Sequence, residues 1–172
     1  MPIQLVVENL NASIDDKVVL HDLAVTAQAG HILALMGKGG CGKSTFLRVI
    51  NRMAEEGGAV VSGHIMLDNS SIFMQDISLL RQKVGMVFTE PVLFAGNILG
   101  NITAGLRLQG IKKKQKLEEC AEETLGYMGI LEEFRDLLYT DASYLNRSQA
   151  QLVCIARALA LRPGLLLMDE LG

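Results

Sequence analysis

One stretch of the sequence has residue types at a spacing suited to holding phosphate. It runs from Gly37 to Thr45 and fits the pattern G-x-x-x-x-G-K-[ST]. Glycines allow backbone N–H groups to turn toward phosphate oxygens, Lys43 can reach the terminal phosphates, and the Ser44 hydroxyl can bind Mg²⁺. The candidate residues for binding ATP are Gly37, Lys38, Gly39, Gly40, Cys41, Gly42, Lys43, Ser44 and Thr45.

The segments on either side of this stretch fit a phosphate-binding loop. Residues Ile32–Met36 form a short apolar run, which predicts a buried strand that enters the loop. Residues Phe46–Met53 carry apolar positions at helical spacing, which predicts a helix with its positive end at the anion. The alternative is a glycine-rich turn that fits the pattern by chance. The predicted order of strand, loop and helix argues against that alternative.

Two carboxylates follow another apolar run and complete a candidate site. Leu165–Met168 predicts a strand, and Asp169 and Glu170 come directly after it. Asp169 could hold Mg²⁺ through water, opposite Ser44. Glu170 could orient or deprotonate an attacking water, so it is the candidate catalytic residue. A pair of strand-end acids without a role is the alternative, and their position downstream of a good loop favours the functional interpretation.

The rest of the chain alternates between strand and helix patterns. Strands are predicted at Ile3–Glu8, Lys17–Ala27, Ala59–Leu67 and Val84–Phe88. Helices are predicted at Ile77–Gln82, within Asn97–Leu137 and at Gln149–Leu161, where Pro163 and Gly164 end the pattern. The charge run from Lys112 to Glu123 is typical of a solvent-facing helix surface. This order predicts an α/β fold with its site at the carboxyl ends of the strands.

Composition narrows the protein class. The 172 residues suffice for one domain with a core, and 16 basic against 19 acidic residues give a net charge of -3. That balance does not favour nucleic acid as a partner. No apolar stretch has the length of a membrane span and the first residues lack a basic leader, so we expect a cytosolic protein. Three dispersed cysteines without a C-x-x-C pair argue against a zinc site or a disulfide framework.

From Val7 onward the chain resembles the ATP-binding subunits of ABC transporters. The resemblance rests on the Gly37–Thr45 loop, on residues 154–160 and on Leu165–Glu170. The segments Asn51-Arg52-Met53 and Gly105–Gly110 resemble the phosphate-import members of that family. The implied fold is a P-loop NTPase (RecA-like) core with an antiparallel β subdomain and an inserted α-helical subdomain. We expect one domain, with residues 1–93 and 163–172 as core and β subdomain and residues 94–162 as helical subdomain.

The resemblance also implies partners and a location. ATP and Mg²⁺ would be the ligands, and a second ATP-binding subunit would complete a homodimer. Membrane permease subunits would hold the protein at the cytoplasmic, inner face of the cell membrane. A small kinase is a weaker alternative, because the resemblance continues far beyond the phosphate loop.

Several positions depart from the family pattern. Thr89 replaces a Gln that contacts Mg²⁺ and the attacking water, which leaves Thr89 a weak candidate Mg²⁺ ligand. The family motif Leu-Ser-Gly-Gly-Gln is Leu145–Gln149 here, with Arg147 and Ser148 in place of both glycines. Asn146 still suits a helix cap, whereas side chains at the glycine positions would crowd the γ-phosphate of a partner's ATP. Arg147 could alternatively supply a compensating charge to that phosphate.

Two further family features are missing from the pattern. Residues Ser13 and Ile14 stand where an aromatic ring stacks on adenine, and neither can stack as a ring does. The sequence ends at Gly172, before the family segments with a dimer-contact Asp and a His that grips the γ-phosphate. The core strand that ends at Asp169 would then expose an edge or pair elsewhere. We expect weak or absent hydrolysis, and two functions stay open: a transport ATPase, or a non-hydrolysing regulatory or remnant module.

Overall fold

The protein is described by a computed structural model that covers residues 2–170. Contacts along the chain divide it into two compact units. The first holds residues 2–86 and 163–169, and the second holds residues 87–162 together with Glu170. Each unit has its own buried apolar cluster.

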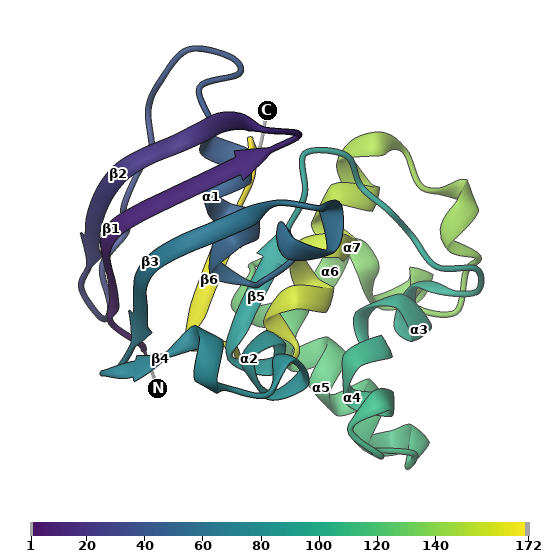
Figure 1. The fold of residues 1–172 in the computed structure, drawn as a ribbon. Coiled ribbons are helices and arrows are strands. Elements are labelled where there is room, and N and C mark those ends of the chain that lie inside the picture. Colours follow the sequence, from purple (N-terminus) through teal and green to yellow (C-terminus); the bar gives the residue numbers. More distant parts are fainter. Residues whose placement is uncertain (1, 171–172) are drawn as a thin grey trace. The chain divides into compact units, whose positions relative to one another are not determined.

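An antiparallel sheet forms one side of the first unit (Figure 1). Its strand order is β2-β1-β3-β4. The strands are β1 (Leu5–Ile14), β2 (Lys17–Ala27), β3 (Val60–Leu67) and the short β4 (Ser70–Ser71). β2 has the predicted bounds, whereas β1 continues well beyond its predicted end at Glu8.

Two tight turns join neighbouring strands of this sheet. Asp15 and Asp16 connect β1 to β2 with φ values of 48° and 60°. Asp68 and Asn69 connect β3 to β4 with φ values of 46° and 64°. Two successive residues with positive φ match the twist of a hairpin, and Asp and Asn tolerate this conformation better than most residues. The local sequence therefore specifies both reversals.

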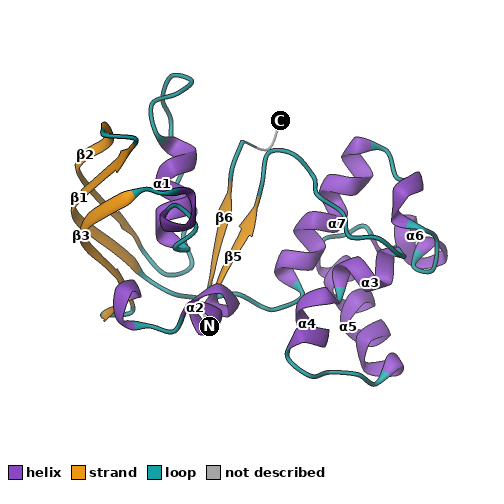
Figure 2. Ribbon diagram, turned by 45° about the vertical axis from the view of Figure 1, so that its right-hand side comes forward, coloured by secondary structure: helices purple, strands orange, loops and turns teal. Residues whose placement is uncertain are grey.

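A helix and a two-stranded sheet complete the first unit. Helix α1 (Lys43–Ile50) lies between the β1–β3 sheet and the pair formed by β5 and β6 (Figure 2). The pair consists of β5 (Val84–Val87) and β6 (Leu165–Met168), and α2 (Ile77–Lys83) precedes β5. Two short 3₁₀ turns, η1 (Glu55–Gly57) and η2 (Ile72–Met74), lie between these elements. Phe46, Val49 and Ile50 are buried, so one face of α1 enters the core.

The predicted strand at Ile32–Met36 is wrong for the described structure. This segment has no assigned strand, and Ile32 and Met36 are 101% and 94% exposed. A strand persists only when its backbone groups pair with a neighbour. Within residues 2–170, β5 and β6 pair with each other and no strand pairs with this segment. The apolar run therefore enters the phosphate loop as irregular chain that is exposed except at Leu35, which packs against the core.

The second unit is helical. Its helices are α3 (Ile98–Ile102), α4 (Ala104–Leu108), α5 (Lys114–Tyr127), α6 (Leu131–Phe134) and α7 (Arg147–Leu159), with 3₁₀ turns η3 (Arg135–Leu137) and η4 (Ala142–Tyr144). Ile98, Leu125, Phe134 and Val153 are fully buried in its core. The helices expected between Asn97 and Leu137 are thus present as several short ones.

Polar side chains cap the start of α7 and of η4. Asn146 accepts a hydrogen bond from the Gln149 backbone at 2.9 Å, and the Gln149 side chain accepts one from the Asn146 backbone. This reciprocal capping starts α7 at Arg147, two residues before the predicted Gln149. At η4, hydrogen bonds to Asp141 from the Ser143 side chain, and to a smaller extent from the Ser143 backbone N–H, lower the pKa of Asp141 below its usual value.

Within residues 2–170, no helix has the length and apolar character needed to cross a membrane.

The helical core yields a direct test. Phe134 is fully buried, so Phe134→Ala should lower the free energy of unfolding by about 3–5 kcal/mol through lost burial and a cavity. Tyr127 is 85% exposed, and Tyr127→Ala should change the free energy of unfolding by less than about 0.5 kcal/mol. Urea denaturation followed by circular dichroism measures both. Equal effects of the two substitutions would contradict the assigned core.

Candidate functional site

The phosphate loop reaches α1 through a glycine that no other residue replaces without strain. Gly42 is the N-cap of α1 with a φ of 96°, and no side chain caps the helix there. A Cβ at this position would lie 2.8 Å from Leu20 Cδ2 and 3.0 Å from the Val19 carbonyl oxygen. The loop therefore passes against β2. It leaves the first N–H groups of α1 without a capping side chain, which is the arrangement that suits an anion.

Lys43 lies across the loop that precedes it. Its Nζ donates hydrogen bonds to the carbonyl oxygens of Gly37 at 3.0 Å and Lys38 at 3.2 Å. The ammonium group is thus held on the inner side of the turn formed by residues 37–42. A cation in this position neutralises negative charge on a phosphate that the loop's N–H groups contact.

Ser44 and Asp169 meet although 125 positions separate them. The Ser44 hydroxyl donates to the Asp169 carboxylate at 2.8 Å, and only 3% of Asp169 is exposed. Ser44 lies in the first turn of α1, and Asp169 directly follows β6. The first unit therefore brings together the two residues that the sequence predicted as opposite Mg²⁺ ligands.

The chemistry of these groups fits Mg²⁺ and a nucleotide triphosphate. A hydroxyl and a carboxylate are hard oxygen donors, which Mg²⁺ prefers, and Mg²⁺ retains several waters in phosphate sites. Lys43 and the N-terminal end of α1 supply positive charge toward the phosphates. Residues Gly37–Cys41 are exposed, so the loop is accessible to a ligand.

The other predicted site residues are placed as follows. Glu170 is exposed, directly follows Asp169 and has a φ of 42°. Thr89 is half-buried in the second unit, in the segment after β5. Ser13 and Ile14 are half-buried at the end of β1. The roles predicted for Glu170 and Thr89 stay predictions.

Arg147, which the sequence analysis placed at a glycine position of the family motif, has a defined partner. Arg147 is the first residue of α7, and its guanidinium forms an ion pair with Glu90 at 2.8 Å. Both side chains are exposed, at 66% and 73%, so this pair contributes little stability. It nevertheless directs the guanidinium toward the segment after β5. Arg147 is therefore engaged inside the second unit.

Sequence reasoning missed the side chains that hold this segment. Gln151 donates to the Phe88 carbonyl at 2.9 Å, and Arg157 donates to the Val92 carbonyl at 2.7 Å. Arg157 also lies 4.5 Å from the centre of the Phe94 ring. Gln151 lies four positions after Arg147 on α7, and Arg157 lies six positions after Gln151. That spacing was readable from the sequence, but their backbone partners lie more than 60 positions away.

The loop geometry can be tested at Gly42. Gly42→Ala should lower the free energy of unfolding by about 1–3 kcal/mol, because a side chain there combines positive φ with a close contact to β2. Gly39 has open space around it and no positive φ, so Gly39→Ala should change the free energy of unfolding by no more than about 0.5 kcal/mol. Thermal unfolding of both variants measures the difference. A tolerant Gly42 would contradict the described loop.

Comparison with known proteins places this chain in a family. The model for the family described as ABC transporter matches residues 20–171. The phosphate import ATP-binding protein PstB of Borreliella afzelii (strain PKo) is 40% identical over 166 residues, covering 95% of this chain and 64% of that protein. PstB of Ehrlichia ruminantium (strain Gardel) is 40% identical over 167 residues, covering 95% and 66%. The chain thus spans about two thirds of the length of these relatives.

Solved structures with a similar fold also come from ABC transporters. CbiO1 from Clostridium perfringens, part of the ABC transporter complex cbiONQ, has a TM-score of 0.80 at 27% identity, covering 96% of this chain and 64% of its own. A bacterial Atm1-family ABC exporter with ATP bound has a TM-score of 0.83 at 25% identity, covering 98% and 29%. The fold is that of a P-loop NTPase of this type. This chain belongs to the ABC transporter family and is similar in sequence to ATP-binding proteins of phosphate import.

Proposed function

We propose that this chain binds Mg-ATP and is the nucleotide-binding part of a phosphate importer. The observation that carries the proposal is the contact between Ser44 and Asp169 at 2.8 Å, beside the Lys43 ammonium in the phosphate loop. Residues from distant parts of the chain converge there in the arrangement that phosphate chemistry requires.

Each residue of the site has a distinct role in binding. The N–H groups of the Gly37–Thr45 loop contact the phosphates, and Lys43 neutralises their charge. Ser44 and Asp169 hold Mg²⁺, the carboxylate acting through water. Bound Mg²⁺ would supply further neutralisation of the phosphate oxygens. Glu170 orients a water near the terminal phosphate, as a general base would.

Hydrolysis at this site is weak. Thr89 provides a shorter side chain than the Gln expected there, and a loss of position of about 1 Å can cost on the order of a hundredfold in rate. Arg147 and Ser148 replace two glycines whose backbone would approach the γ-phosphate of a partner's ATP. The ion pair of Arg147 with Glu90 supports this view, because it engages the guanidinium that could otherwise compensate.

The relatives suggest the transported substrate and the partners. Two of them are phosphate import ATP-binding proteins, and one structural neighbour is part of an ABC transporter complex. By that likeness, this chain pairs with a second ATP-binding subunit and docks on membrane permease subunits. Its place would be the cytoplasmic face of the membrane, as a peripheral protein.

The alternative function is a nucleotide-binding module that does not hydrolyse ATP. The replaced glycines and Thr89 favour it as much as they favour weak hydrolysis. The two functions differ in one measurable quantity, the release of inorganic phosphate. Both require the same Mg-ATP site.

Binding is tested at Lys43. Lys43→Ala should weaken Mg-ATP binding roughly 10- to 100-fold, because a hydrogen bond to a charged group contributes about 1.5–3 kcal/mol. Lys116 is exposed in α5, and Lys116→Ala serves as the charge-matched control with unchanged affinity. Titration with a fluorescent ATP analogue measures both. Absence of binding by the unaltered chain would refute the proposal.

Hydrolysis is tested by phosphate release with excess Mg-ATP. We expect the unaltered chain to release phosphate slowly, above the rate of Lys43→Ala. Release at that background rate, with binding intact, would favour the non-hydrolysing module. Restoring the glycines with Arg147→Gly and Ser148→Gly should not give full turnover, because Thr89 remains. Full turnover from this double variant would show that Thr89 is not limiting.

A further inference from the structure

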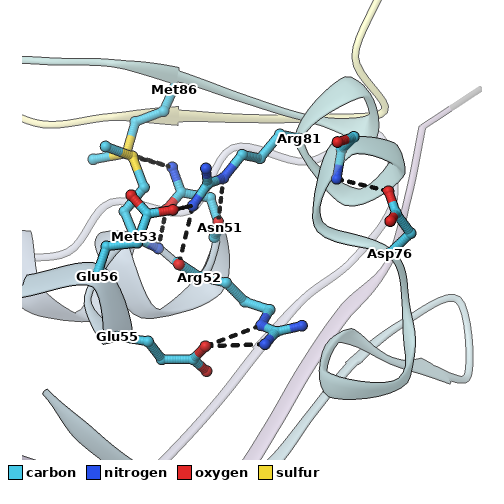
Figure 3. A network of polar contacts seen from close by, with 9 residues as sticks. Asn51, Arg52, Met53, Glu55, Glu56, Asp76, Arg81 and Met86 are labelled. Atoms are coloured by element: carbon cyan, nitrogen blue, oxygen red, sulfur yellow. Dashed lines mark hydrogen bonds and ion pairs between the residues drawn. The ribbon is translucent and has the colours of Figure 1, made fainter. Parts of the chain in front are cut away.

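The segment Asn51-Arg52-Met53 follows α1 directly and has no role in the site described above. Asn51 is only 2% exposed, and its side chain lies in a network of polar contacts at the C-terminal end of α1 (Figure 3). A buried amide needs partners, because an unpaired one costs about 1–3 kcal/mol. The partners of Asn51 come from its own turn and from β5.

Two thioether sulfurs and one backbone N–H satisfy the Asn51 amide. Its Nδ2 donates to Met86 Sδ at 2.9 Å and to Met53 Sδ at 3.2 Å, and its Oδ1 accepts from the Met53 N–H at 3.2 Å. Met86 belongs to β5. Asn51 therefore connects the end of α1 to this strand.

Arg81 holds the same helix end from α2. Its guanidinium donates to the carbonyl oxygens of Asn51 and Arg52, both at 3.1 Å, and pairs with Glu56 at 2.6 Å. Carbonyl groups at a helix C-terminus lack intrahelical partners and carry partial negative charge. A guanidinium that spans two of them satisfies these groups and fixes the helix end in orientation as well as in position.

These contacts hold α1 in place at both of its ends. Its N-terminal end is tied to the end of β6 through Ser44 and Asp169, and its C-terminal end to β5 through Asn51 and Met86. β5 and β6 are neighbours in one sheet. Because α1 has only 8 residues, a tilt at its far end changes the direction of its phosphate-binding end.

We propose that Asn51 and Arg81 are positioning residues for the phosphate site, acting through α1. Neither touches the nucleotide. They hold the C-terminal end of α1 so that Lys43, Ser44 and the first N–H groups stay aimed at the phosphates. The inference rests on the proposed binding of Mg-ATP and adds to it residues that lie outside the loop.

The test combines affinity with hydrogen exchange. Arg81→Met and Asn51→Ala should each weaken Mg-ATP binding roughly 3- to 30-fold, the range expected for coupling between connected residues. In the nucleotide-free protein, both should speed amide exchange in α1 more than in β1 and β2. Amide hydrogen exchange followed by mass spectrometry measures this effect without any bound ligand.

Arg48→Met is the matched control. Arg48 also lies in the last turn of α1, but its side chain is exposed and forms no hydrogen bond or ion pair with α2 or β5 among the described residues. Arg48→Met removes one positive charge from the same helix end, and its affinity should stay within about twofold of the unaltered chain. Should Arg81→Met fail to fold, Arg81→Lys keeps the charge without the planar fork and should show the same loss of affinity.

The outcomes separate this inference from the proposed function. Unchanged affinity and unchanged α1 exchange in Arg81→Met and Asn51→Ala would overturn the inference alone. Faster exchange throughout the first unit, with affinity lost only in proportion to the unfolded fraction, would make the two residues merely structural and also overturn it. No Mg-ATP binding by the unaltered chain, with α1 ordered, would overturn the proposed function and the inference with it.

Discussion

The hydrogen bond between Ser44 and Asp169 is the interaction on which the site depends. It joins positions 125 residues apart at 2.8 Å, so it forms only when α1 and β6 are both in place. Closing so long a loop costs chain entropy, which a single hydrogen bond cannot offset. The burial of α1 between the β1–β3 sheet and the β5–β6 pair offsets this cost, and the bond then sets the direction of the helix (Figure 2).

The entry to the phosphate loop has less support than the helix that leaves it. Ile32–Met36 has the composition of a buried strand, yet no described strand pairs with it, and of its side chains only Leu35 packs against the core. The loop is instead held from the other side, by the contact of Gly42 with β2 and by the hydrogen bonds of Lys43. The position of the loop thus depends on α1 and on the contacts at both ends of α1.

In the second unit, local side chains fix the start of α7. Asn146 and Gln149 cap α7 reciprocally, so the helix begins at Arg147 with no glycine in its first turn. The Arg147 side chain pairs with Glu90, and the side chains of Gln151 and Arg157 bond to the segment that follows β5. Helix capping requires only local side chains, whereas close approach of backbone N–H groups to a phosphate is easiest at residues without a side chain.

The sequence by itself determined the features that depend on neighbours along the chain. The hairpin at Asp15-Asp16, the bounds of β2, the cap of α7 and the phosphate loop all follow from local residue types and periodicity. It also indicated that Ser44 and Asp169 belong to one site, because both fit known roles in phosphate binding. Tertiary structure alone decided their contact, the exposure of Ile32–Met36 and the contacts of Asn51 with Met86 and Arg81. These outcomes depend on which strand pairs with which and on what packs across the core, and local sequence does not encode that pairing.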